Sequence, residues 1–191
     1  MPETEKFRLY ITLQHRNELP GYHWALLLAP KYETNDPQDP PDSWLFHATN
    51  SIQVPQGGMS ALQAAYGPAP WRKETRAVSS IKSGNMIGRV LIAKLSSSTP
   101  LLVHTQYIDE VVSAVPIVQN NPRWTCAVWA LQALQLLRDH GGFFSTIPDP
   151  SGEGFYRAIY DFGDTALNAI QNRTKPIKRA TDFPCVDMRV R

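Results

Sequence analysis

The sequence lacks the cysteine patterns of metal-binding and disulfide-rich proteins. Its two cysteines are Cys126 and Cys185, and neither a CxxC pair nor a cysteine–histidine cluster has the spacing of metal ligands. We therefore expect no metal site and no other cofactor. A cytosolic setting would leave both thiols free, so either one is available for chemistry.

Long hydrophobic runs and an excess of charge of one sign are also missing. The chain has no stretch of about eighteen apolar residues that would span a membrane, and the charged segment 1–6 has no signal-peptide core. We therefore expect a cytoplasmic protein without an integral membrane segment. The 19 basic and 17 acidic residues leave a net charge of +2, and the basic segment 173–179 has no interleaved aromatics. Nucleic-acid binding is not expected.

The segments that are present predict one α+β domain. A chain of 191 residues with 42% hydrophobic content can bury a core without a disulfide or metal. Alternation, β-branched and aromatic residues predict an antiparallel sheet of about five strands. The expected strands cover residues 7–14, 22–29, 43–49, 71–78 and 87–95.

Four helices are predicted, three of them after the last of these strands. Capping residues and apolar periodicity favour one helix over 99–115, a second that opens near Pro122 and stops at Gly141, and a third over 154–171, with a short one near 59–66. We expect residues 1–172 to form a single catalytic-type domain. Residues 173–191 are interpreted as a basic C-terminal tail.

A cysteine and a histidine about a hundred residues apart are the strongest functional signal. Cys126 lies in the first turn of a predicted helix, where backbone N–H groups and the helix dipole favour a thiolate and can bind an oxyanion. His23 begins an apolar strand, from which an imidazole can act as general base and acid. His47, on the next strand, is the candidate that orients His23.

The residues around these three are candidates for a substrate pocket. They are Tyr22, Trp24, Asn50, Trp124 and Thr125. A structural interpretation stands beside the catalytic one, because Cys126 also continues the apolar stripe of its helix, and buried free cysteines are commonly inert.

Local sequence favours the catalytic interpretation. The segments Tyr22–Leu27, Trp44–His47 and Thr125–Cys126 resemble the lecithin-retinol acyltransferase family and its phospholipase/acyltransferase relatives. That resemblance implies a circularly permuted papain-like fold in which a helix carrying the nucleophile packs on the sheet. It also implies roles by position: His23 as base, His47 as orienting residue and Cys126 as nucleophile.

A longer stretch, from Arg8 to about Asn172, resembles a group of uncharacterised, mainly fungal proteins. The shared order is a Leu-Tyr strand, Tyr-His-Trp-Ala-Leu-Leu, Arg-Val-Leu-Ile, a Val-Pro turn and a Trp-x-Cys helix. The chain departs from the acyltransferase pattern at Thr125, where those enzymes carry Asn. Its loop between the two histidines is longer, and basic residues replace their C-terminal hydrophobic anchor.

These observations predict a thiol protease-like hydrolase or acyltransferase. It would act on an amide, ester or thioester of a small molecule or peptide through an acyl-Cys126 intermediate. Two alternatives stay open: a non-catalytic binding or interaction module of the same fold, and a cofactor-free cyclase or isomerase of a small metabolite that uses the His23/His47 pocket. The sequence does not distinguish hydrolysis from acyl transfer.

Overall fold

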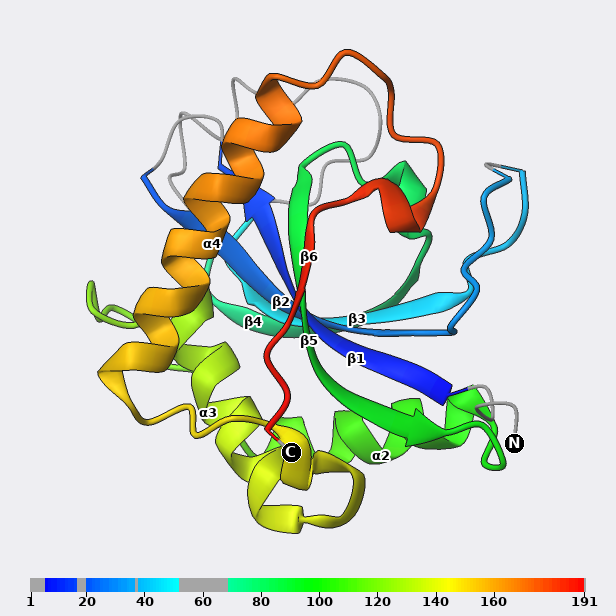
Figure 1. The fold of residues 1–191 in the computed structure, drawn as a ribbon. Helices are drawn as coiled ribbons and strands as arrows, with labels where there is room; N and C mark the ends of the chain where they lie inside the picture. The colour runs from blue at the N-terminus through cyan, green and yellow to red at the C-terminus, as the bar shows by residue number, and fades with distance from the viewer. Residues whose placement is uncertain (1–5, 17–19, 37, 52–68, 191) are drawn as a thin grey trace.

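A mixed six-stranded sheet forms the centre of the protein, which is described here by a computed structural model over residues 6–16, 20–36, 38–51 and 69–190. The strand order is β4-β3-β2-β1-β5-β6 (Figure 1). The strands are β1 (Lys6–His15), β2 (Tyr22–Ala29), β3 (Ser43–Thr49), β4 (Arg72–Val78), β5 (Met86–Ser96) and β6 (Cys185–Asp187). The helices in the described part of the chain are α2 (Leu101–Ser113), α3 (Cys126–His140) and α4 (Glu153–Gln171), with short 3-10 turns η1 (Ser80–Lys82), η2 (Gly142–Thr146) and η3 (Ala180–Asp182).

The α+β class is confirmed, and the sheet is larger than predicted. The five expected strands pair antiparallel with their neighbours, but β6 adds a sixth strand, parallel to β5. The expectation of a purely antiparallel sheet was therefore wrong at this edge. β6 is three residues long, which is too short for an alternation signal. The helix predicted near 59–66 lies outside the described residues.

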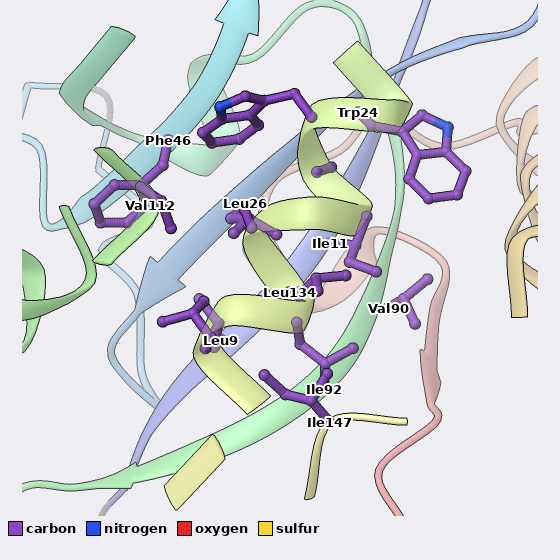
Figure 2. Close-up of a cluster of buried hydrophobic side chains, with 14 of the residues drawn as sticks. Leu9, Ile11, Trp24, Leu26, Phe46, Val90, Ile92, Val112, Leu134 and Ile147 are labelled. Carbon is purple, nitrogen blue, oxygen red and sulfur yellow. The ribbon is translucent and has the colours of Figure 1, made fainter. Parts of the chain in front are cut away.

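One face of the sheet carries the main hydrophobic core. Because side chains alternate along a strand, Leu9 and Ile11 of β1 and Trp24 and Leu26 of β2 point to the same face, where they pack with Leu134 of α3 (Figure 2). The three α-helices contribute side chains to this core and lie along this side of the twisted sheet (Figure 1). None of these helices is both long and apolar enough to cross a membrane, as judged over the described residues.

The opposite face carries a smaller apolar cluster and several polar groups. Tyr10, Ala25, Leu27, Leu45 and Leu91 form that cluster. The connection from β4 to β5 crosses this face, since β4 lies at one edge of the sheet and β5 lies beyond β3, β2 and β1. We call this side the inner face.

Arg89 forms a buried ion pair and also contacts the C-terminal segment. Arg89 of β5 binds Glu33 at 2.5 Å, and both side chains are 4% exposed. Arg89 also donates a hydrogen bond to the carbonyl of Ala180, which precedes β6. The segment after residue 172 is thus tied to the sheet by specific contacts, as well as by the parallel pairing of β6.

Helix α4 packs across the start of β2. Tyr22 donates a hydrogen bond to Asp164, and its ring lies 5.3 Å from that of Tyr160. Gly163 makes this approach possible: a methyl group at its Cβ position would contact the Tyr22 ring, 2.8 Å from Cδ2 and 3.0 Å from Cζ. Gly163 interrupts the apolar pattern of α4, and the packing explains why a glycine lies there.

Candidate active site

Helix α3 begins at the candidate nucleophile. Thr125 is its N-cap residue, and the Thr125 hydroxyl accepts a hydrogen bond from Val128 N–H at 3.4 Å. Cys126 is the first helical residue. Its thiol is 2% exposed, because it packs into the main core between α3 and the sheet.

The thiol occupies a gap in the sheet beside His23. Pairing between β2 and β3 covers Leu26–Leu28, and closer to the start of β2 the backbone groups on that side lack this partner strand. There the Trp24 N–H donates to Cys126 Sγ at 3.5 Å, and the thiol donates to the Tyr22 carbonyl at 3.9 Å. These two backbone atoms belong to the residues on either side of His23, so the thiol contacts both neighbours of the candidate base.

Burial governs the protonation of this thiol. It raises the pKa of Cys126, against the opposing effects of the Trp24 N–H, the Arg16 charge and the N–H groups of Ala127 and Cys126 itself. The sequence favoured a thiolate in the first turn of the helix, and the structure gives the opposite direction. The dipole and N–H groups are present, but desolvation outweighs them.

His23 and His47 form a hydrogen-bonded chain that ends on a carboxylate. His23 Nε2 and His47 Nδ1 are 2.7 Å apart, and His47 Nε2 lies 2.9 Å from Glu74 Oε2. His47 on β3 and Glu74 on β4 are directly paired across the two strands. Strand alternation places all three side chains on the inner face, opposite α3.

The chain of acceptors fixes which nitrogen of each ring carries a proton. Burial, with smaller contributions from His47, Arg16 and Arg76, lowers the pKa of His23 to about 3, and burial also lowers the pKa of His47 despite the opposing effect of Glu74. Both rings are therefore neutral near pH 7. Glu74 accepts the Nε2–H of His47, so His47 Nδ1 accepts the Nε2–H of His23. This leaves the lone pair of His23 on Nδ1, the nitrogen nearer the backbone.

The charge of Arg16 acts on both the thiol of Cys126 and the imidazole of His23. This positive charge lowers the pKa of both Cys126 and His23. Arg16 directly follows β1, whose residue Gln14 pairs with His23. A fixed cation close to both groups favours negative charge at the thiol and opposes positive charge on His23.

The thiol and the imidazole do not form a hydrogen bond in this conformation. Within the described residues, the hydrogen bonds of Cys126 Sγ involve the backbone of β2, and none reaches a histidine. The reason is geometric: the His23 side chain leaves β2 towards the inner face, whereas Cys126 approaches from α3. His23 Nδ1 makes no hydrogen bond with any described residue.

The five expected pocket residues lie in different environments. Trp24 is 1% exposed and stacks on Tyr156 of α4 at 5.3 Å. Trp124 is also buried, in an edge-to-face contact with Trp71 at 5.1 Å. Asn50 and Trp71 line a cavity of about 540 Å³ together with residues 119–122, just before α3. The remaining two, Tyr22 and Thr125, make the α4 contact and the N-cap described above.

Sequence reasoning missed Glu74 and Arg16. Glu74 is the one acidic residue of β4, and alternation alone puts it on the same face as Arg72 and Arg76. Recognising its role needs the pairing of β3 with β4, which joins segments separated by the whole of residues 52–68. Arg16 follows the end of a strand, and nothing in its local sequence marks it.

Comparison with known proteins identifies the family. Residues 6–149 match the family described as "Family of unknown function (DUF6914)", and the chain belongs to it. This region contains α3 and every residue of the thiol–histidine–glutamate arrangement, but not α4 or β6. No curated protein and no solved structure matches the chain. Across the described residues, no group of three or more His, Cys, Asp or Glu side chains is arranged to hold a metal ion.

Proposed function

We propose that this protein is a cysteine-dependent hydrolase or acyltransferase with a permuted papain-like arrangement. It acts on an amide, ester or thioester through an acyl-Cys126 intermediate. One observation carries the proposal: the thiol of Cys126 contacts both backbone neighbours of His23, and the imidazole of His23 ends a hydrogen-bonded chain from Glu74. The sequence resemblance assigns Cys126, His23 and His47 independently of these contacts.

In the first step, the thiol attacks the carbonyl carbon of the substrate. Sγ forms the new bond while His23 Nδ1 accepts the thiol proton, and the carbonyl π electrons move to oxygen. This transfer requires the thiol to turn from its contacts with the Trp24 and Tyr22 backbone towards the imidazole. A neutral thiol and a neutral imidazole start the reaction, which agrees with the directions of both pKa shifts. The N–H groups of Cys126 and Ala127, which act on the thiol at rest, are available to donate to the oxyanion.

In the second step, the tetrahedral intermediate collapses. The oxyanion electrons reform the carbonyl, the bond to the leaving amine, alcohol or thiol breaks, and His23 returns its proton to the leaving group. The acyl group now resides on Cys126. Water or another acceptor attacks this thioester by the reverse sequence, with His23 taking the acceptor proton, and regenerates the thiol.

Glu74 supports the charge that His23 acquires during these steps. When His23 is protonated on both nitrogens, its Nε2–H still donates to His47 Nδ1, and His47 donates onward to Glu74. A carboxylate at the end of the chain stabilises the cation and keeps His47 in the tautomer that accepts from His23. Glu74 is thus a positioning residue in the proposed mechanism.

A second candidate function is a non-catalytic binding module. It is favoured by the 2% exposure of Cys126 and by the raised pKa of its thiol, both of which are typical of a core cysteine. In this interpretation the histidine chain is a structural polar network, and replacing Cys126 by Ala leaves function unchanged.

Acylation of the two cysteines by an activated ester tests the proposal. The exposed Cys185 serves as an internal reference, because its thiol pKa is also raised by burial but it has no imidazole contact in the described residues. With p-nitrophenyl acetate and peptide mass spectrometry, we expect Cys126 to be acetylated faster than Cys185, with a stoichiometric burst of nitrophenolate. A Cys185→Ser background isolates the Cys126 signal.

The matched histidine variants separate catalysis from simple accessibility. His23→Ala should slow acetylation of Cys126 by about 100-fold or more, as expected for loss of a general base. His140→Ala, an exposed histidine at the other end of α3, should leave the rate unchanged. Acetylation confined to Cys185, or an equal rate in the His23→Ala variant, would support the non-catalytic module instead.

A further inference from the structure

The inner face of the sheet contains a cavity that the proposed reaction does not use. Its volume is about 280 Å³, and residues from β1 to β5 and from the β2–β3 and β4–β5 connections line it. The cavity adjoins the histidine chain: Leu45 lies two positions before His47 on the same face, and Arg76 lies two positions after Glu74. Cys126 is not among its lining residues.

The polar lining of the cavity includes two cations. Arg76 and Lys82 line it, and no carboxylate of the described residues does. Among the described residues, neither cation takes part in a hydrogen bond or ion pair. Glu74, two positions before Arg76 on the same strand, is hydrogen-bonded to His47 and does not line the cavity. The cavity lining therefore has positive side chains and, among the described residues, no negative one.

Two buried hydroxyl groups in the same lining have no partner among the described residues. Ser79 is 6% exposed and Ser80 is 4% exposed, and the Oγ atom of each is fully buried without a hydrogen bond to any of these residues. Buried hydroxyls in folded proteins are normally paired, because an unpaired one has lost its hydration without compensation. The hydroxyls of Ser79 and Ser80 can donate hydrogen bonds to an anionic group that the charge of Arg76 attracts.

Much of the remaining lining is apolar, although Thr12, Gln14 and Ser83 also contribute to it. Leu27, Leu45, Val78 and Met86 form the floor, and Met86 adds a flexible side chain that adapts to the shape of a ligand. A cavity of this size admits a small molecule rather than a peptide or a nucleotide pair. Apolar side chains together with cationic and hydroxyl groups suit a molecule that has an apolar chain and an anionic head group.

We propose that this cavity binds a small organic anion, whose short apolar chain lies on the Leu27–Leu45 floor and whose carboxylate or phosphate is held by Arg76, Ser79 and Ser80. Cys126, His23 and His47 do not line this cavity, although the charge of Arg76 contributes to the lowered pKa of both histidines. Occupancy of the cavity does not require the thiol, so this proposal goes beyond the proposed catalytic function and can fail or hold independently of it.

Calorimetric titration of the full chain with six-carbon probes tests the proposal. The probes are hexanoate, hexyl phosphate and hexanol, at constant ionic strength set with sodium chloride. We expect saturable binding of at least one anion, no binding of hexanol, and about a fourfold loss of affinity for each methylene removed between hexanoate and butyrate. The preferred anion identifies the head group as carboxylate or phosphate.

Variants of one strand supply the controls. Arg76→Gln should weaken binding by tenfold or more, whereas Arg72→Gln, on the same strand and face but outside the cavity, should leave it unchanged. Cys126→Ala should also bind normally, so a failure of catalysis does not affect this result. Equal affinity for hexanol, or equal weakening by both arginine variants, would overturn the proposal.

The serine variants should change the melting temperature and the affinity for the anion in opposite directions. Ser79→Ala and Ser80→Ala should raise the melting temperature of the ligand-free protein, because each removes a buried unpaired hydroxyl, and should weaken binding of the anion. A lower melting temperature together with unchanged affinity would show that these hydroxyls have other partners and would overturn their assignment to the ligand.

Discussion

Replacing Gly163 by Ala should destabilise the protein, although the same change in most helices stabilises it. An alanine in a helix interior is favoured over glycine by about 1 kcal/mol. Here the added methyl group would meet the ring of Tyr22 at 2.8 Å from Cδ2, and that ring is held by the hydrogen bond to Asp164. Overpacking of this kind costs about 1–3 kcal/mol, so the net effect is a loss of about 1 kcal/mol.

Thermal unfolding measures this loss against a control in the same helix. For a chain of this size, about 1 kcal/mol lowers the melting temperature by about 2–4 °C. At Gly154, also in α4, a methyl group would meet nothing within 4 Å, so Gly154→Ala should leave the melting temperature unchanged or raise it. An increase for Gly163→Ala equal to that for Gly154→Ala would refute the close contact between α4 and Tyr22.

A double-variant cycle locates the cause of the effect. If the Tyr22 ring is responsible, Gly163→Ala introduced into a Tyr22→Leu background should no longer destabilise, and the helix preference for alanine should reappear. The same loss in both backgrounds would mean that another contact of α4 is responsible, such as its packing on β5.

Two further predictions concern the histidine chain. Glu74→Gln should preserve the fold but slow acetylation of Cys126 by about tenfold or more, because a neutral amide no longer stabilises protonated His23 through His47; a pH–rate profile identical to that of the parent would contradict this role. The free energy of unfolding in urea should fall as pH decreases from about 6.5 towards 3, because the pKa of His23 is lowered to about 3 in the fold, so the unfolded chain binds the proton first. His23→Asn should flatten this dependence, and an unchanged slope would show that other groups cause it.

The elements with strong local patterns were the predictable part of the fold. The strands Tyr22–Ala29 and Ser43–Thr49 begin and end where their apolar runs indicated. Their succession along the chain also predicted neighbouring antiparallel strands with His23 and His47 on one face. α3 ends at Gly141, as expected, but begins at Cys126 rather than near Pro122, because Thr125 provides the N-cap.

Other features depend on contacts between distant segments. β6 was not predicted, because three residues carry no periodicity and its pairing is decided by β5 and the Arg89 contacts. Glu74 completes the histidine chain only through the register of β3 and β4. The inner-face cavity likewise arises where five strands and the η1 turn converge.

Local sequence sufficed to identify the candidate nucleophile and its two histidines, because a strand start and a helix start are set by neighbouring residues. Local sequence did not predict the protonation states of Cys126 and His23. Burial of Cys126 between α3 and β2 raises its pKa, against the direction expected for a helix N-terminus, and burial of His23 lowers its pKa. Desolvation depends on everything packed around a group, so only the tertiary structure decides whether the pair begins as thiol and neutral imidazole or as an ion pair.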